Sequence, residues 1–392
     1  MPQALVEPSK KTTSSVQDVT QEKPAFGSRF LTDEVDVWSQ NAWDHVPAPD
    51  HQVEAIAKSL SKQRLAPVPL EEKQKLNEKP AKHWDNFYKT NAANFFRDRK
   101  WLHNEFPELV AATQPDAGQK TIVEVGCGAG NSVFPLLSSN LNPDLSLHAY
   151  DYAAHAVKLV QHDPLYLNPP VGTIHAAVWD VTSDDGLPSN LVLESADLVI
   201  MVFVMSALHP DEWGRAVANV HKILKPGGLV LLRDYGRYDM TQLRFKGGRL
   251  LEENFYIRGD KTRVYFFEVD ELSLLFTGSK AAAAELTHTT TDTPLAVGDR
   301  IGSDPSPVTI DAGDEDPPTE DPTASGQISV STVSVADTPS AIHPNLLEPL
   351  ADCPPHPLFA TEHLGIDHRL IVNRKRQLKM YRVWMQAKFR KL

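Results

Sequence analysis

The sequence predicts an α/β protein built on a doubly wound, mainly parallel sheet. A β-branched strand at 121–125 is followed by a glycine-rich loop at 126–130, and together they read TIVEVGCGAG. Beyond this loop, apolar strands and helical segments alternate as far as residue 236, which is typical of repeated βα units. Near the C-terminus, HRLIVNR and KMYRVWMQAKFRK are separated by a basic turn. These two segments predict a hairpin that adds antiparallel strands at or near the sheet edge.

The elements after the loop are predicted by apolar runs and by the residues that end them. Pro226 is followed by two glycines, which end a helix and begin the next strand. The predicted elements are a strand at 145–151, a strand end at 177–181, a strand at 196–204, a helix at 211–224 and a strand after Pro226.

The glycine loop predicts a site for a nucleotide-type cofactor. Gly126 and Gly128 have no Cβ, so their backbone N–H groups can approach a ligand closely. The dinucleotide fingerprint is G-x-G-x-x-G, whereas here the third glycine comes one residue early and Asn131 follows it. The pattern E-x-G-x-G-x-G, which starts at Glu124, favours S-adenosylmethionine over NAD.

Two further strand ends supply the remaining contacts expected for this cofactor. Asp151 ends the strand at 145–151, where its carboxylate can accept both ribose hydroxyls. Asp180 is placed to accept the adenine amino group, and Val181 to pack on the adenine ring. Since ligands of such sheets bind outside the carboxyl ends of the strands, we expect these residues to converge.

Composition favours a cytoplasmic enzyme without a structural metal. The two cysteines, Cys127 and Cys353, form neither a disulfide framework nor a C-x-x-C pair. The chain has no run of about 18 apolar residues, so no membrane span or membrane partner is expected. The first residues lack an apolar signal core and carry acids without arginine, unlike a mitochondrial presequence.

The negative charge is concentrated in one polar tract. Between Gly278 and Pro357 there are thirteen acidic residues against only Lys280 and Arg300, so nearly all of the net charge of −12 lies there. The tract is too polar to bury a core and too long for an ordinary loop. We predict a disordered acidic insertion at 277–357, either a solvated spacer or a site of Ser and Thr phosphorylation.

Several long motifs resemble the eukaryotic tRNA 3-methylcytidine methyltransferases. They are AFGSRFLTDEVDVWSQNAWDHV, KHWDNFYKTNAANFFRDRKWLHNEFPEL, FVMSALHPDEW, RDYGRYDMTQLRFKGGRLLEENFYIRGDKTRVYFF and the C-terminal HRLIVNRKRQLKMYRVWMQAKFRK. The FGSRF and NAWD segments resemble the threonine and arginine tRNA branch more than the serine branch. The resemblance implies a class I methyltransferase with a Rossmann-like seven-stranded sheet, the terminal hairpin and a small N-terminal helical RNA-binding extension.

The resemblance also implies a domain order along the chain. We expect a disordered tail at 1–24, a helical extension at 25–110 that binds tRNA and covers the cofactor, and the first part of the methyltransferase core at 111–276. The acidic insertion at 277–357, which departs from the family pattern, and a core hairpin at 358–392 follow.

The implied reaction is methyl transfer from S-adenosylmethionine to N3 of cytosine 32 in the anticodon loop of a tRNA. The resemblance adds Trp84 and Tyr88, an i, i+4 pair that would close over the cofactor, and Val202 beside the adenine. N3 of neutral cytidine carries a lone pair and no proton, so the reaction requires alignment rather than a general base. We single out Asp234 and Asp239 as groups that either stabilise charge or position the base, or cap a turn.

Basic residues near aromatic side chains predict the RNA-binding surface. The densest group lies in the last 26 residues, and a second lies between Arg233 and Arg263. In the second group the candidates for stacking on loop bases are Tyr235, Tyr238, Phe255 and Tyr256. A solvated charged face is the plainer interpretation of each group. The candidate RNA-binding residues are Arg97, Arg99, Lys100, Arg237, Arg244, Arg249, Arg263, Arg374, Arg376 and Lys379.

Three functions remain open from the sequence. The first is the tRNA methyltransferase, with tRNA as partner and an aminoacyl-tRNA synthetase or another accessory protein as a further candidate. The second is a Rossmann methyltransferase acting on a small molecule or a protein. The third is a non-catalytic RNA-binding scaffold, against which the intact Gly126, Asp151 and Asp180 speak.

Overall fold

The computed structural model describes residues 29–32, 35–49, 52–188, 190–282 and 342–392. The predicted tail at 1–24 and residues 283–341 of the predicted insertion lie outside the described residues. Within the described ranges, no helix is long and apolar enough to cross a membrane.

The described part of the chain forms an eight-stranded sheet with the order β1-β10-β11-β6-β5-β2-β3-β4. The central strands β4, β3, β2, β5 and β6 run parallel, and the hairpin β10–β11 joins β6 in antiparallel orientation. This confirms the doubly wound sheet and the terminal hairpin. The strands are β1 (Ala42–Asp44), β2 (Lys120–Val125), β3 (Leu145–Asp151), β4 (Thr173–Val178), β5 (Ala196–Val202), β6 (Leu224–Tyr235), β10 (Phe359–Asn373) and β11 (Leu378–Lys391).

Helices cover both faces of this sheet. Val123 and Val125 of β2 pack on one side with α9 and α11, whereas Ile122 packs on the other side with α4 to α7. Because both faces are buried at the middle of the sheet, β5 and the middle of β6 are nearly continuous apolar runs, whereas β3, nearer the edge, alternates. The helices are α1 (Val53–Leu65), α2 (Leu70–Asn77), α3 (Pro80–Asn91), α4 (Leu102–Glu105), α5 (Pro107–Ala112), α6 (Val133–Ser138), α7 (Ala154–Gln161), α8 (Pro164–Leu167), α9 (Trp213–Ile223), α10 (Met240–Leu243) and α11 (Val269–Thr277).

Between β6 and α11 the chain builds a second, small sheet. Its three strands are β7 (Leu250–Glu252), β8 (Phe255–Ile257) and β9 (Arg263–Tyr265). Helix α1 packs beside this region, where Gln63 donates to the carbonyls of Gln242 and Phe245 at 2.9 and 3.0 Å. The N-terminal extension is thereby held against a segment that follows it by about 180 residues.

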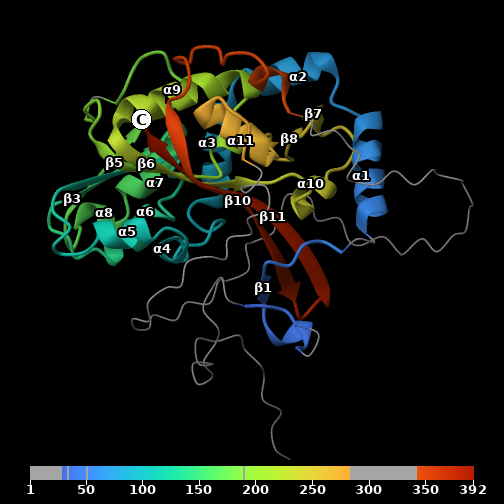
Figure 1. Cartoon of the computed structure of the whole chain (residues 1–392), viewed down its shortest axis with the longest axis horizontal. Coiled ribbons are helices and arrows are strands. Elements are labelled where there is room, and N and C mark those ends of the chain that lie inside the picture. Colours follow the sequence, from blue (N-terminus) through green and yellow to red (C-terminus); the bar gives the residue numbers. More distant parts are fainter. Residues whose placement is uncertain (1–28, 33–34, 50–51, 189, 283–341) are drawn as a thin grey trace, which may run out of the picture.

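The hairpin extends well beyond the parallel sheet, and β1 pairs with its outer half (Figure 1). Ala42 to Asp44 pair with Arg369 to Ile371 of β10. The N-terminal extension was predicted to be helical, but its NAWD segment forms this strand. The reason is that Trp43 is buried against Leu370 and Val372 of the hairpin, which offers an unpaired edge.

A buried network of charges joins the hairpin to the N-terminal half of the chain. Asp367 of β10 accepts hydrogen bonds from Arg233 of β6 and from Arg369. Arg369 also contacts Glu105 at 2.7 Å and Asp44 at 3.5 Å. Burial, opposed by the stronger effect of the two arginines, leaves the pKa of Asp367 lowered to about 2.

The predicted insertion ends earlier than the sequence analysis indicated. Residues 342–357 were assigned to it, yet His343 N–H donates to Glu271 of α11 at 2.9 Å and Leu346 is buried in the main core. The boundary at 357 was therefore wrong. This segment carries Ile342, Leu346, Leu347 and Leu350, but the acidic composition of the longer tract concealed them.

Candidate cofactor and nucleic-acid site

The glycine loop adopts a backbone that only glycine supports without strain. Gly126 and Gly128 have φ of 65° and 54°. A Cβ on Gly126 would lie 2.6 Å from Val204 Cγ2, and a Cβ on Gly128 would lie 2.4 Å from the Tyr88 hydroxyl. The loop thus packs so closely against Val204 and Tyr88 that no side chain fits at these two positions.

The strand ends converge on one cavity, as predicted. Its volume is about 1060 Å³, and it runs along the carboxyl ends of β2, β3 and β5. The Asp151 carboxylate accepts hydrogen bonds from Gly128 N–H at 2.9 Å and from Ala153 N–H at 2.8 Å, which hold it beside the loop. Seven of the eight predicted cofactor residues line the cavity: Trp84, Tyr88, Gly126, Asp151, Asp180, Val181 and Val202. The eighth, Gly128, is not part of the lining, but it lies next to Tyr88 and Asp151, which are.

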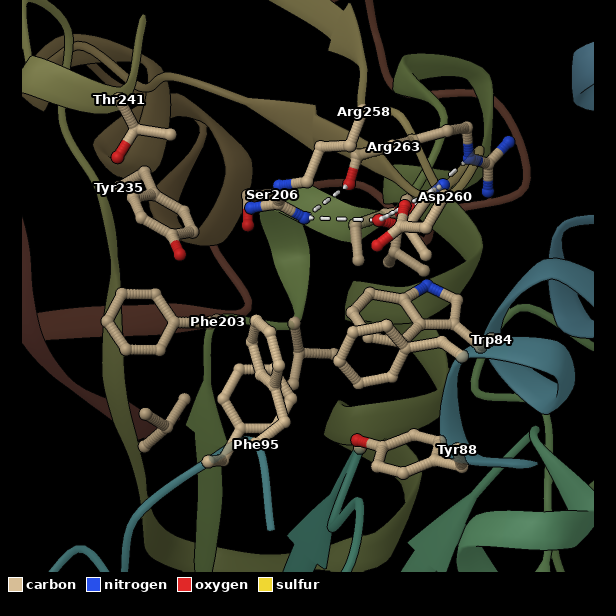
Figure 2. A pocket seen from close by; sticks show the side chains of 18 of the residues that line it. Trp84, Tyr88, Phe95, Phe203, Ser206, Tyr235, Thr241, Arg258, Asp260 and Arg263 are labelled. Atoms are coloured by element: carbon tan, nitrogen blue, oxygen red, sulfur yellow. Dashed lines mark hydrogen bonds between the residues drawn. The ribbon is translucent and has the colours of Figure 1, made fainter. Parts of the chain in front are cut away.

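Helix α3 covers this part of the cavity. Pro80 starts the helix, and its apolar face carries Trp84 and Tyr88, whose rings stack at 6.0 Å between centroids. Figure 2 shows both rings on the same side of the cavity. Asp85 on the same helix accepts a hydrogen bond from His155 N–H at the start of α7 at 2.8 Å. The helix is therefore fixed to the strand–helix unit that carries Asp151.

A second compartment of the same cavity was not predicted as a unit. Phe203, directly after β5, packs against Tyr235 at the end of β6 with ring centroids 4.7 Å apart. Both rings face the cavity on the side opposite Trp84 and Tyr88, with Ser206 and Thr241 near them (Figure 2). Phe203 has φ of 60°, a strained backbone for an aromatic residue. The sequence signal that could have identified Phe203 is its position directly after a strand end, next to Val202, which was predicted to lie beside the adenine.

The rim of the second compartment is basic. Arg244, Lys246, Arg258 and Arg376 all line the cavity, and they come from the α10 region, the β8–β9 turn and the turn of the hairpin. Arg244, Lys246 and Arg376 are exposed. The chain as a whole carries −12, so this local excess of positive charge indicates a polyanionic ligand at the mouth of the cavity.

Arg99 lines the cavity, and behind the lining its guanidinium meets the buried Glu124. Glu124 is 1% exposed, and burial raises its pKa to about 7 although Arg99 opposes the shift. Arg99 Nη1 lies 3.4 Å from Glu124 Oε1 and donates to Ser132 Oγ at 2.9 Å. Arg99 was predicted to contact RNA together with Arg97 and Lys100; it lines the cavity instead of lying on a solvated face, and its contact with RNA stays a prediction.

Asp234 and Asp239 lie behind the cavity rather than in it. Asp234 is fully buried and accepts hydrogen bonds from the N–H groups of Ser206 and Tyr235 at 3.0 and 2.8 Å; burial raises its pKa to about 6. Asp239 caps α10 and accepts from Arg382 Nε at 2.8 Å and Val383 N–H at 2.9 Å. Neither carboxylate is part of the cavity lining, so a role of these acids at the target base stays a prediction. The alternative prediction, that these acids cap a turn, describes Asp239, whose side chain caps α10.

The predicted RNA-binding residues divide into exposed and buried groups. Arg237 is 6% exposed and pairs with Glu268 at 2.7 Å, and Arg263 is 2% exposed and pairs with Glu212 at 3.0 Å. Neither is on an outer surface, and Arg249 is half-buried. The stacking candidates Phe255 and Tyr256 are buried in the core. The residues that the structure leaves exposed are Arg97, Lys100, Arg244, Arg374, Arg376 and Lys379.

Much of the basic C-terminal segment is used inside the protein. Arg382 pairs with Asp239, Lys388 with Glu108 and Lys391 with Glu194, at 2.8, 2.6 and 2.9 Å. The exposed cations of this segment are grouped at the hairpin turn. There, Arg374 donates to Asn41 Oδ1 and Lys379 lies over the ring of Trp38, which brings the N-terminal extension beside the turn.

The fold and the glycine-loop cavity define a class I methyltransferase. In agreement, residues 123–230 match the methyltransferase domain family model. The chain is 41% identical over 365 residues to a tRNA(Thr) (cytosine(32)-N(3))-methyltransferase of Saccharomyces cerevisiae; the match covers 93% of this chain and 45% of that protein. It is 37% identical to a tRNA N(3)-methylcytidine methyltransferase of Schizosaccharomyces pombe, covering 97% of each. A tRNA N(3)-cytidine methyltransferase of Danio rerio is 40% identical, with 66% of this chain and 80% of that protein covered.

The chain belongs to the tRNA N(3)-methylcytidine methyltransferase family. It spans about half of the length of the Saccharomyces cerevisiae relative and nearly all of the Schizosaccharomyces pombe relative.

Proposed function

We propose that this protein is an S-adenosylmethionine-dependent methyltransferase that forms 3-methylcytidine at position 32 in the anticodon loop of threonine tRNA. One observation carries the proposal: a single cavity joins a glycine-loop cofactor cradle to an aromatic compartment with a basic rim. The first part suits a nucleoside donor, and the second suits a planar base attached to phosphates.

The donor supplies a methyl group on a positively charged sulfur. The residues of the chain hold the two reactants and keep water away. Gly126 lines the cavity without a side chain, and Asp151 and Asp180 provide carboxylate acceptors for ribose and adenine. Trp84 and Tyr88 cover the cavity from α3, so that the cofactor is enclosed between the helix and the strand ends.

The chemistry requires no side chain to remove a proton. N3 of a neutral, unpaired cytosine carries an in-plane lone pair that attacks the methyl carbon directly, and the product is cationic. The buried positions of Asp234 and Asp239, with their oxygens engaged by N–H donors, agree with this requirement. Rate acceleration then comes from alignment of the nucleophile, methyl and sulfur in a preorganised site.

The aromatic pair of the second compartment is suited to an unstacked base. Phe203 and Tyr235 present ring faces and edges next to Val202, which lines the cofactor part of the cavity. N3 lies on the pairing edge of cytosine, so the target must be single-stranded or flipped, a condition that an anticodon loop meets at low cost. Arg244 and Arg376 at the rim are placed to contact the phosphates on either side of the base.

The names of the relatives support the finer assignments. The Saccharomyces cerevisiae relative is named for threonine tRNA and for cytosine 32, which favours the same substrate here, with arginine and serine tRNAs as the other candidates. An aminoacyl-tRNA synthetase or another accessory protein, and a cytoplasmic location, remain part of the proposal.

Incubation of unmodified threonine tRNA transcripts with labelled donor tests the proposal, with and without cell extract. We expect label in 3-methylcytidine at position 32, and no label in a transcript that carries uridine there. Label only in small molecules or proteins would support the second class of function. Donor binding without transfer in either arm would support a non-catalytic scaffold.

A further inference from the structure

A buried carboxylate lies directly behind the aromatic compartment. Asp234 precedes Tyr235 at the end of β6, and its side chain is fully buried. It accepts hydrogen bonds from Tyr235 N–H at 2.8 Å and from Ser206 N–H at 3.0 Å. Tyr235 and Ser206 both line the cavity. Asp234 therefore joins two parts of the compartment wall without being part of the wall itself.

Ser206 connects this carboxylate with the cavity. It is 2% exposed and lies in a 3-10 turn, η3 (Met205–Ala207), shortly after β5. Its hydroxyl forms a hydrogen bond with Asp234 besides the one from its N–H group. Ser206 lies on the Tyr235 side of the cavity, away from Trp84 (Figure 2). The Ser206 hydroxyl is therefore the group through which Asp234 can act on a ligand of the compartment.

The turn that carries Ser206 is fixed on both sides. The carbonyl before it, on Met205, accepts a hydrogen bond from Trp213 Nε1 at 3.1 Å. The carbonyl after it, on Ala207, accepts one from Arg263 Nε at 3.2 Å. Both donors belong to buried side chains. The Ser206 hydroxyl is thus held in place by the protein itself, as a preorganised site requires.

The hydrogen bond to Asp234 determines in which direction the Ser206 hydroxyl works. A hydroxyl has one proton and two lone pairs, whereas an ionised carboxylate can only accept. Burial raises the pKa of Asp234 to about 6, so the carboxyl is mainly ionised at neutral pH. Ser206 then uses its proton in the hydrogen bond with Asp234 and presents only lone pairs to the cavity. This point of the compartment wall is a hydrogen-bond acceptor.

An acceptor beside the target base distinguishes cytosine from uracil. Next to N3, cytosine carries an exocyclic amino group that donates hydrogen bonds, whereas uracil carries a carbonyl oxygen that only accepts. A fixed acceptor therefore stabilises bound cytosine and leaves the carbonyl of uracil facing lone pairs. A site built to hydrogen-bond one group of its substrate rejects analogues that lack this group.

Methyl transfer also creates a positive charge on the base. The N3 lone pair forms the new bond to the methyl carbon, and the electron pair of the carbon–sulfur bond stays on sulfur. No proton moves, so the positive charge leaves the sulfur and is shared by N3 and the amino group of the product. Within the part of the chain that the structure describes, Asp234 forms no ion pair, and Arg258 affects its pKa less than the Ser206 and Tyr235 hydrogen bonds do. The negative charge of Asp234 can therefore stabilise a cationic base on the other side of Ser206.

We propose that Ser206 selects cytosine as the target base by accepting a hydrogen bond from its exocyclic amino group. Asp234 is the positioning residue that orients the Ser206 hydroxyl and, through it, stabilises the cationic product. This inference rests on the proposed function and adds to it the residue that determines base specificity.

The first test compares two RNAs that differ only in the group that Ser206 contacts. One is a threonine anticodon stem-loop with cytidine at position 32. The other carries 2-pyrimidinone riboside there, which keeps N3 and O2 but lacks the amino group. With saturating S-adenosylhomocysteine, we expect the native protein to bind the cytidine RNA about 3- to 10-fold more tightly, the range for one hydrogen bond.

Variants of Ser206 assign this preference to its hydroxyl. For Ser206→Ala we expect the two affinities to lie within about twofold of each other, whereas Ser206→Thr keeps a hydroxyl and should retain most of the preference. Ser273→Ala is the matched control, because Ser273 is also 2% exposed but lies on α11 and is not part of the cavity lining. It should keep the native preference. Thermal unfolding checks that each variant is folded.

The second test measures the effect of charge on the reaction. In single-turnover methyl transfer to saturating cytidine RNA, Ser206→Ala should be about tenfold slower than the native protein, because the positive charge appears on the base only in the transition state and product. An unchanged rate would remove the role in charge stabilisation.

The third test reverses the Ser206 hydroxyl. In Asp234→Asn the amide can donate to Ser206 Oγ, which frees the hydroxyl proton for the cavity. We expect the native protein to bind cytidine at position 32 at least about fivefold more tightly than uridine, and Asp234→Asn to lose this preference. If Asp234→Asn does not fold, the Ser206 variants decide the question alone.

Three binding results would overturn the proposal. The first is a Ser206→Ala variant that keeps the native preference for the cytidine RNA, and the second is a native protein that binds the cytidine and 2-pyrimidinone RNAs equally. The third is a folded Asp234→Asn variant that still discriminates against uridine. Failure of the proposed function is distinguishable, because the native protein would then form no 3-methylcytidine at position 32, which is assayed separately.

Discussion

Replacing Gly128 by alanine tests whether the loop and helix α3 form one cofactor cradle. The added Cβ is forced into φ of 54° and would lie 2.4 Å from the Tyr88 hydroxyl, so either the loop or Tyr88 must move. The left-handed backbone costs about 1–2 kcal/mol, and overpacking against a buried side chain adds about 1–3 kcal/mol. We therefore expect Gly128→Ala to lose about 2–5 kcal/mol of unfolding free energy and to bind S-adenosylhomocysteine about tenfold more weakly or worse.

Gly118 provides the matched control. Its φ is 68°, but a Cβ there would meet nothing within 4 Å. Gly118→Ala should therefore show the backbone cost of about 1–2 kcal/mol alone and unchanged ligand affinity.

A double-variant cycle isolates the contact itself. Tyr88→Phe removes the hydroxyl and leaves the ring carbon Cζ as the nearest atom, at 3.2 Å from the Cβ. In the Tyr88→Phe background, Gly128→Ala should cost about 1–3 kcal/mol less than in the native protein, measured by chemical denaturation and calorimetry. Equal costs in the two backgrounds, or equal behaviour of Gly128→Ala and Gly118→Ala, would refute the reasoning.

Three further predictions concern protonation, the buried charges and RNA. Burial raises the pKa of Asp151 to about 6, so binding of 5′-methylthioadenosine, which needs the ionised carboxylate, should weaken by about tenfold per unit below pH 6. The same carboxyl should make the unliganded protein more stable as the pH falls from about 6 to 4, because the folded state takes up the proton first. Calorimetry at pH 5–8 checks the ligand affinity, and thermal unfolding at pH 4–8 checks the stability. A flat pH profile of either quantity in the native protein would contradict the corresponding prediction. Asp367→Asn should lose about 3–5 kcal/mol, because Asp367 is the buried counter-charge that Arg233 and Arg369 share and the variant leaves both arginines only Glu105 and Asp44, whereas Arg390→Met, at a half-exposed pair, should lose less than about 1 kcal/mol; similar losses in denaturant would count against the network. Arg376→Ala should weaken tRNA binding and reduce the salt slope by about 1, while Arg390→Ala should not, and an unchanged slope for Arg376→Ala would remove it from the interface.

The sequence was sufficient to predict which strand ends converge on the cavity. Gly126 and Asp180 follow strands and Asp151 ends one, and the carboxyl ends of parallel strands must meet at one edge of the sheet. The prediction needed only local patterns and the topology rule. Trp84 and Tyr88 came from the resemblance, since nothing in their own spacing distinguishes a cofactor cover from a core face.

The sequence was insufficient to tell which charges face outward. Arg369 pairs with Glu105, which is 264 residues away in the sequence, and Lys391 pairs with Glu194, which is 197 residues away. A basic stretch of sequence therefore does not necessarily form a basic surface. The sequence also could not show that Arg99 points inward, because Asp98 and Lys100 on either side of it are exposed. The aromatic compartment was missed for a related reason: Phe203 and Tyr235 become neighbours only when β5 and β6 pair.

The most direct test of the account is a crystal structure of the protein with S-adenosylhomocysteine and a threonine anticodon stem-loop. We expect cytosine 32 outside the base stack, beside Phe203 and Tyr235, with its N3 atom facing the sulfur across the space that the methyl group would fill. A cytosine that stays stacked in the loop, or that turns another atom toward the sulfur, would contradict the proposal that this cavity aligns the two reactants.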